Sequence, residues 1–133
     1  MVHSKLLTKL ACYGNNEKLI TWIKNFLTGR SQYVKIAGSI SPTCFVTSGV
    51  PQDSVLGPVL FIVFVNDICD VVTDGVTVTL FADDTKLYHV IKNTVDRDNL
   101  HSCLTAIFEW SAHWQLSLSP SKCSVLPSFV CSC

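Results

Sequence analysis

The sequence lacks the cysteine pairs that mark metal sites and disulfide frameworks. Its seven cysteines include no C-x-x-C pair, and an odd number of thiols cannot all pair within one chain. This argues against a structural zinc site and against a small secreted scaffold held by disulfides. We expect reduced thiols and an intracellular protein, in the cytoplasm or the nucleus. The cysteines are Cys12, Cys44, Cys69, Cys103, Cys123, Cys131 and Cys133.

Long apolar runs are also missing. The longest, residues 55–65, is interrupted by Gly57 and Pro58, and it is far shorter than the roughly 20 residues that a membrane-spanning helix needs. The first residues form a polar, basic helical pattern rather than a secretion signal. The sequence therefore predicts no membrane span, and we interpret residues 55–65 as a buried helix.

The chain has no net charge, because ten Lys and Arg residues balance ten Asp and Glu residues. Overall neutrality argues against a free-standing nucleic-acid binder. The charges are nevertheless segregated. Residues 1–35 carry six cations and the single acid Glu17, whereas residues 52–84 carry six aspartates and no Lys or Arg. The first segment is suited to a polyanion and the second to cations, although solvated charged faces explain the pattern equally well.

The 133 residues suit one domain. Apolar residues at helical spacing, β-branched runs and turn signals predict the order α-α-β-β-α-β-β-α-β. This order indicates an α+β domain in which an antiparallel sheet is covered by helices on one face. Asn16 and Ser54 are candidate helix caps, and Asp74-Gly75 is a turn signal. The expected helices cover residues 3–13, 16–28, 54–72 and 94–114, and the strands cover 31–37, 43–50, 76–82, 85–91 and 122–126.

Two adjacent aspartates, Asp83 and Asp84, follow an apolar run and precede a second strand-like segment. Like charges side by side repel each other unless a cation compensates for them. At the tip of a β-hairpin both carboxylates can face one point, and Mg²⁺ prefers such oxygen ligands. The alternative is that both residues only form the turn, for which aspartate is well suited.

The resemblance of longer motifs to a known protein family decides between the metal site and the plain turn. "SGVPQDSVLGPVLF" at 48–61 and "LFADDTKLY" at 80–88 resemble the palm of reverse transcriptases, in particular those of non-LTR retrotransposons. The similarity continues in order through "HSKLLTKLACYG", "WIKNFLTGRSQYVKIAG" and "LSLSPSKCSVL", and so covers about residues 2–126. It implies a partial polymerase palm that acts on an RNA template, a DNA primer and deoxynucleoside triphosphates. We divide it into residues 1–47, 48–92 with the nucleotide loop and the Asp-Asp hairpin, 93–127 with a helix and a final strand, and an irregular tail, 128–133.

The resemblance also implies roles for single residues. Asp83 and Asp84 match the pair that helps to hold two Mg²⁺ ions. Lys122 matches a lysine that assists proton transfer to pyrophosphate, and Arg30 matches a basic residue that meets the nucleic-acid backbone. For both, a plain surface role is the alternative. The loop that approaches nucleotide and template is matched by Gly49, Pro51, Gln52 and Ser54; Gln52 can instead cap the loop.

Two departures from the family pattern limit the expected activity. In the family, the other metal-bridging aspartate lies before the segment that matches residues 3–13, and we expect this chain to begin after that aspartate. We also expect the fingers and the thumb to be missing. Asp53 stands where the family has glycine, which adds a negative charge near the nucleotide phosphates and restricts the backbone. We therefore expect a fragment of a longer polyprotein that is inactive alone. The alternative is a non-enzymatic relic of a mobile element with weak nucleic-acid binding.

Overall fold

The computed structural model describes residues 1–73 and 75–126. The predicted turn at Asp74 and the predicted tail, 128–133, lie outside the described residues. The helices are α1 (His3–Cys12), α2 (Glu17–Leu27), α3 (Leu56–Val65) and α4 (Thr94–Trp114), with the 3₁₀ helices η1 (Asn66–Val71) and η2 (Pro120–Lys122). The strands are β1 (Ser31–Gln32), β2 (Lys35–Ile36), β3 (Ser39–Ile40), β4 (Cys44–Phe45), β5 (Thr77–Phe81) and β6 (Asp84–Tyr88).

The mixture of helices with antiparallel strands confirms an α+β chain, but the predicted single sheet is wrong. The described strands form three separate antiparallel pairs, β1 with β4, β2 with β3, and β5 with β6. Strands of two residues, such as β1 to β4, offer too few backbone groups to recruit a further strand. The expected final strand is also wrong. Lys122 ends a 3₁₀ helix, and residues 123–126 form no strand; Val125 and Leu126 are exposed and so bury no apolar surface that would hold a strand in place.

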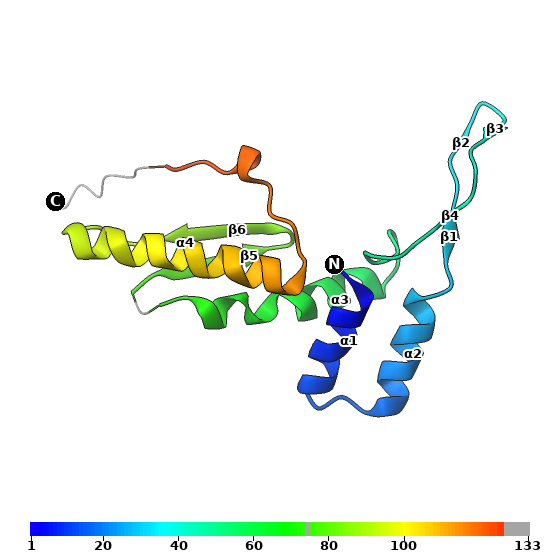
Figure 1. Cartoon of the computed structure of the whole chain (residues 1–133), viewed down its shortest axis with the longest axis horizontal. Helices are drawn as coiled ribbons and strands as arrows, with labels where there is room; N and C mark the ends of the chain where they lie inside the picture. The colour runs from blue at the N-terminus through cyan, green and yellow to red at the C-terminus, as the bar shows by residue number, and fades with distance from the viewer. Residues whose placement is uncertain (74, 127–133) are drawn as a thin grey trace.

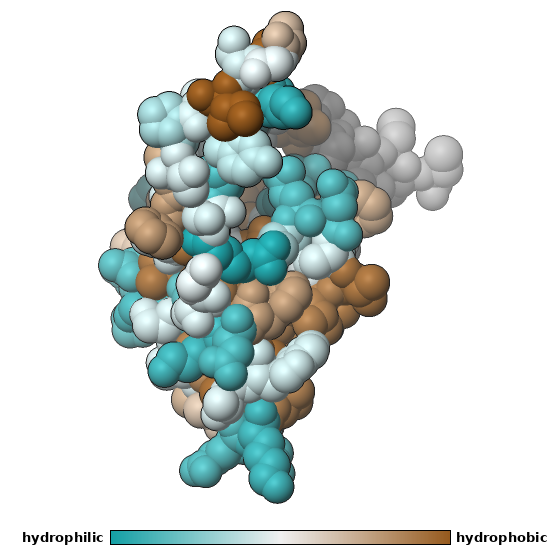
Figure 2. All heavy atoms as spheres, turned by 90° about the vertical axis from the view of Figure 1, so that its right-hand side faces the viewer, coloured by the Kyte–Doolittle hydropathy of each residue, from teal (hydrophilic) through white to brown (hydrophobic). Residues whose placement is uncertain are grey.

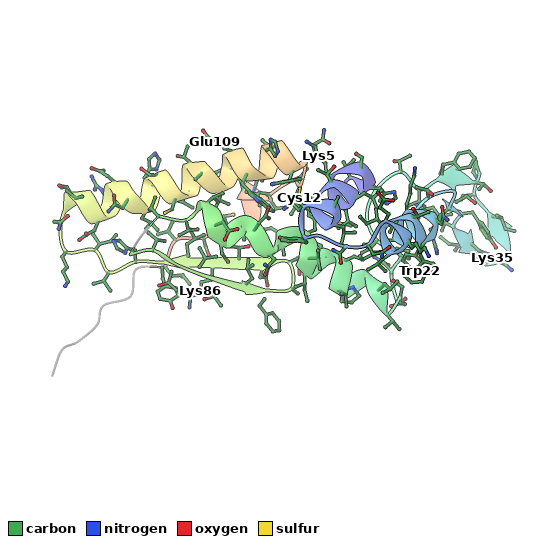
Figure 3. The ribbon with its side chains drawn as sticks, turned by 90° about the horizontal axis from the view of Figure 1, so that it is seen from below. Lys5, Cys12, Trp22, Lys35, Lys86 and Glu109 are labelled. Carbon is green, nitrogen blue, oxygen red and sulfur yellow. The ribbon has the colours of Figure 1, made fainter. Side chains whose placement is uncertain are left out.

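Helices form most of the body, from which an arm projects (Figure 1). The arm consists of β1 to β4, with β2 and β3 at its far end. Helices α1 and α2 form an antiparallel pair beside its base, and α4 runs lengthwise with the β5–β6 hairpin and η1 (Figures 1 and 3). Residues 46–55, between β4 and α3, therefore connect the arm to the body.

One hydrophobic core joins the four helices. Asn16 caps α2 as predicted, since its side chain accepts a hydrogen bond from the Lys18 amide. Phe64 of α3 is fully buried, and its ring meets the edge of Trp114 at 6.2 Å between centroids. The other buried apolar residues of the cluster are Leu6, Leu10, Ile23, Leu27, Leu60, Val65, Ile68, Ile107 and Trp110.

A buried lysine packs against this core. Lys9 is only 3% exposed, donates to the Phe64 carbonyl oxygen at 2.6 Å and pairs with Asp67. Its ammonium lies 4.0 Å from the ring centroid of Trp114 and 4.6 Å from that of Trp110. The Trp110 indole N–H donates to Asp67 at 3.2 Å. Burial lowers the pKa of Lys9, and Asp67 partly opposes that shift. The cluster links α1, α3, η1 and α4.

Part of the surface is apolar. Val59 and Ile62 lie exposed on α3, and Phe81 is 81% exposed at the end of β5. Viewed from the side of the arm, brown apolar residues reach the surface between teal hydrophilic ones (Figure 2). Among the described residues, no helix has both the length and the hydrophobicity to span a membrane.

Candidate functional site

A cavity of about 530 Å³ lies where the arm meets the helices. Arg30 is the one Lys or Arg among its lining residues, and no Asp or Glu lines it. Its walls come from the start of α1, the end of α2, the base of the arm and the loop before α3. The lining residues are His3, Leu27, Arg30, Ser31, Gln32, Phe45, Val46, Thr47, Ser48, Gly49, Val50, Pro51 and Gln52.

The loop at the bottom of this cavity is held by the first residues of the chain. The His3 ring N–H donates to the Gly49 carbonyl oxygen at 2.8 Å, and the Gly49 amide donates to the Met1 carbonyl oxygen at 2.8 Å. Val2 forms a bridge with Ser48. Gly49 has a φ of 84°, a conformation that favours glycine. These bonds fix the loop by contacts over a long sequence separation.

Ser54 has a structural role in the described chain. Its hydroxyl donates to the Pro51 carbonyl oxygen at 2.7 Å and accepts a hydrogen bond from the Gly57 amide at 3.0 Å. Val55, directly before α3, already has helical backbone angles, so the bond from the Gly57 amide gives Ser54 the capping role that the sequence predicts. A Cβ on Gly57 would lie 3.0 Å from both the Pro51 oxygen and the Ser54 hydroxyl. Glycine at position 57 therefore lets the loop fold tightly over the start of α3.

Asp53 has a left-handed backbone, with a φ of 56°. Aspartate tolerates this region better than most residues, whereas glycine adopts it without a steric penalty. The position is one residue beyond Gln52, which lines the cavity. A glycine at position 53 would thus suit the backbone that the structure shows here.

The hairpin is present, but the aspartates do not form its turn as a pair. Phe81 pairs with Asp84, so the two turn residues are Ala82 and Asp83, and Ala82 has a φ of 52°. Leu80 and Leu87 share one face of the hairpin and pack against the core, which sets this register, since a shift by one residue would turn one of the two leucines toward water. Asp83 therefore lies in the turn and Asp84 begins β6.

Both carboxylates are exposed, and no third ligand accompanies them. In the described ranges, no group of three His, Cys, Asp or Glu side chains is arranged to hold a metal ion. Lys122 lies exposed on η2, and no ion pair or hydrogen bond within the described chain joins it to either aspartate. Neither aspartate lines the cavity.

The structure therefore brings together only part of the predicted set. Arg30, Gly49, Pro51 and Gln52 line one cavity, whereas Ser54 caps the helix beside it. The sequence reasoning missed His3, whose contact with Gly49 joins residues 46 positions apart. No local pattern around His3 signals that contact.

Comparison with known proteins identifies the family. The family model described as "Reverse transcriptase (RNA-dependent DNA polymerase)" matches residues 1–129. The chain therefore belongs to the reverse transcriptase family, which confirms the resemblance drawn from the sequence motifs.

The curated relatives are polymerases of Drosophila mobile elements. The chain is 33% identical over 117 residues to "RNA-directed DNA polymerase from mobile element jockey" of Drosophila funebris, which covers 80% of this chain. It is 31% identical over 109 residues to the jockey polymerase of Drosophila melanogaster, and 32% identical over 104 residues to that species' "Probable RNA-directed DNA polymerase from transposon X-element". These alignments cover 77% and 75% of this chain. The match spans 12% of each relative's length. No solved structure matches significantly.

Proposed function

We propose that this chain is part of the palm of an RNA-directed DNA polymerase, in which the cavity receives nucleotide or template and the Asp83-Asp84 hairpin binds Mg²⁺. The single observation that carries the proposal is the cavity. It gathers Arg30 with the Gly49-to-Gln52 loop, and no carboxylate lines it. Polar groups with one cation and no anion suit a phosphate-bearing ligand.

The donor chemistry of the hairpin fits a hard cation. Two exposed carboxylates supply the oxygen ligands that Mg²⁺ takes from proteins, while water and substrate phosphates complete its shell. Mg²⁺ bound there would supply charge stabilisation for a developing pyrophosphate. With two ligands from the described chain, the site holds a cation weakly.

Metal binding is tested with Mn²⁺ as a paramagnetic substitute for Mg²⁺. We expect Mn²⁺ to broaden the amide resonances of residues 82–85 with roughly millimolar affinity, because only two carboxylates contribute. The Asp83→Asn/Asp84→Asn variant should lose this broadening. An Asp70→Asn variant is the matched control, since it removes one exposed carboxylate outside the hairpin. Equal broadening in all three proteins would reject a metal site at the hairpin.

Primer extension tests the activity itself. The purified chain should not extend a DNA primer on an RNA template with Mg²⁺ or Mn²⁺, because catalysis of this reaction depends on the full positioning of both ions. Robust extension that Asp83→Asn abolishes would show that the described ligands suffice.

Asp53→Gly is expected to strengthen nucleotide binding while leaving stability nearly unchanged. The substitution removes a negative charge beside the cavity loop. It also removes the steric cost of a left-handed backbone at a residue with a side chain, which is roughly 1 kcal/mol of folding free energy. Glycine's greater freedom in the unfolded chain, worth about 0.5–1 kcal/mol, offsets that gain. Calorimetric titration with a deoxynucleoside triphosphate, combined with urea unfolding, measures both effects. Weaker binding by Asp53→Gly would count against a nucleotide role for the loop.

The alternative is a non-enzymatic relic of a mobile element that binds nucleic acid weakly. The exposed, two-ligand arrangement at the hairpin favours it. Nucleic-acid binding without Mn²⁺ broadening or extension would support this alternative.

A further inference from the structure

A row of flat side chains follows α2 to the cavity. Trp22 stacks with Phe26 at 6.2 Å between ring centroids and 15° between planes, and the Arg30 guanidinium lies 5.6 Å from the Phe26 centroid. Trp22 and Phe26 are four positions apart and so share one side of α2, whereas Arg30 lies beyond the end of the helix and is placed beside Phe26 by its contact with that ring. Trp22, Phe26 and Arg30 are called the aromatic row below.

The outer end of the aromatic row is open to solvent. The Trp22 side chain is 54% exposed, although its ring is large and apolar. Figure 3 labels Trp22 on α2 and Lys35 on the arm. At the inner end, Arg30 lines the cavity. The aromatic row therefore runs from the surface to the candidate nucleotide site.

Two cations lie along the aromatic row. Exposed Lys18 precedes Trp22 by four residues and so lies on the same side of α2, and Arg30 ends the row beside Phe26, whereas Lys24 lies on the opposite side of the helix. Glu17, at the start of α2, is the one acid in residues 1–35. An exposed aromatic face among cations is complementary to a single strand, because bases stack on the rings while phosphates meet the cations.

We propose that the aromatic row binds single-stranded nucleic acid, with an unpaired base stacked on Trp22 and the backbone following Arg30 into the cavity. An apolar protein partner fits this surface poorly, because it would have to cover the exposed charges of Lys18 and Arg30. This proposal about the aromatic row depends on the proposed function in one respect, namely that the ligand is a nucleic acid. Binding is therefore measured without divalent metal, so that failure of the Asp83-Asp84 site leaves the result unaffected.

The test is fluorescence anisotropy of the full chain with labelled oligo(U), oligo(dT) and an abasic strand of the same length. Intact strands should bind more tightly than the abasic one. Trp22→Ala should weaken binding of intact strands by about 5- to 100-fold, the usual loss for one stacked base, and should leave the abasic strand unaffected. Trp22→Phe should retain most of the affinity. Tighter binding of oligo(U) assigns the surface to RNA, and tighter binding of oligo(dT) assigns it to DNA.

Phe108→Ala is the matched control, because Phe108 is similarly exposed, at 46%, but lies on α4. Circular dichroism establishes that each variant is folded. Arg30→Gln provides a second measurement, since removing one phosphate contact should reduce the slope of log affinity against log salt by about 1. Equal binding of intact and abasic strands by the unmodified chain would overturn the proposal. So would a Trp22→Ala variant that binds intact strands normally but self-associates less, which would show that the row covers protein.

Discussion

Phe64→Ala is expected to lower the free energy of unfolding by about 3–5 kcal/mol, the usual cost of removing a buried phenyl ring. Phe64 is fully buried, and its ring contacts both the Lys9 ammonium and Trp114. The ring fills the point at which α1, α3 and α4 meet, so a cavity there cannot close without moving a helix. A loss of this size consumes much of the stability that a single domain has, roughly 5–15 kcal/mol.

Urea unfolding followed by circular dichroism measures this effect. Ile62→Ala, on the same helix, is the matched control, because Ile62 is 57% exposed and its removal leaves no cavity. It should change the midpoint little. Equal destabilisation by both variants would contradict the packing of α3 described above.

Lys9→Met is expected to destabilise the chain by about 2–3 kcal/mol. Methionine keeps most of the apolar stem but leaves Asp67 without its cation, and breaking one side of a buried pair typically costs 3–5 kcal/mol. The Asp67 side chain is 24% exposed, so water relieves part of that cost. The additional Asp67→Asn substitution should recover most of the loss, because it removes the unpaired charge and keeps an acceptor for the Trp110 indole.

The pH dependence provides a second check on Lys9. Because burial lowers its pKa in the folded state, the unfolded chain binds this proton more tightly. The Lys9 contribution to the unfolding free energy therefore rises with pH between the lowered pKa and the ordinary lysine value. The Lys9→Met variant should lack this rise. Urea midpoints for both proteins across that interval, compared at matched salt, measure it; parallel curves would contradict the burial of Lys9.

The resemblance to reverse transcriptases, rather than local patterning, indicated the Gly49-to-Ser54 loop, part of which lines the cavity. Local patterns indicated a helix beginning near Ser54 and, from the β-branched run before Asp83, a hairpin. The turn itself was placed one residue late, because Ala82 is an unusual residue for a positive φ. Only the packing of Leu80 and Leu87 against the core reveals the register that puts Ala82 there.

The predicted final strand illustrates the opposite error. The pattern of "KCSVL" favours a strand, but a strand requires a partner with free backbone groups. Residues 123–126 pair with none of the three described strand pairs, although the outer edges of these pairs are open. Propensity alone cannot report that absence, since strand formation depends on pairing and burial.

The amino-acid sequence by itself indicated where the four α-helices and the hairpin lie, because each depends on patterns within short stretches of chain, and the resemblance of its motifs indicated the reverse transcriptase family. Residues 66–71, expected to continue the third helix, instead form the 3₁₀ helix η1. Tertiary structure alone decided that Lys9 is buried against Phe64 and that His3 holds Gly49, contacts that join residues 55 and 46 positions apart. It also decided that the strands stay in separate pairs. These features follow from the packing of distant segments, where the burial of one side chain depends on all its neighbours at once.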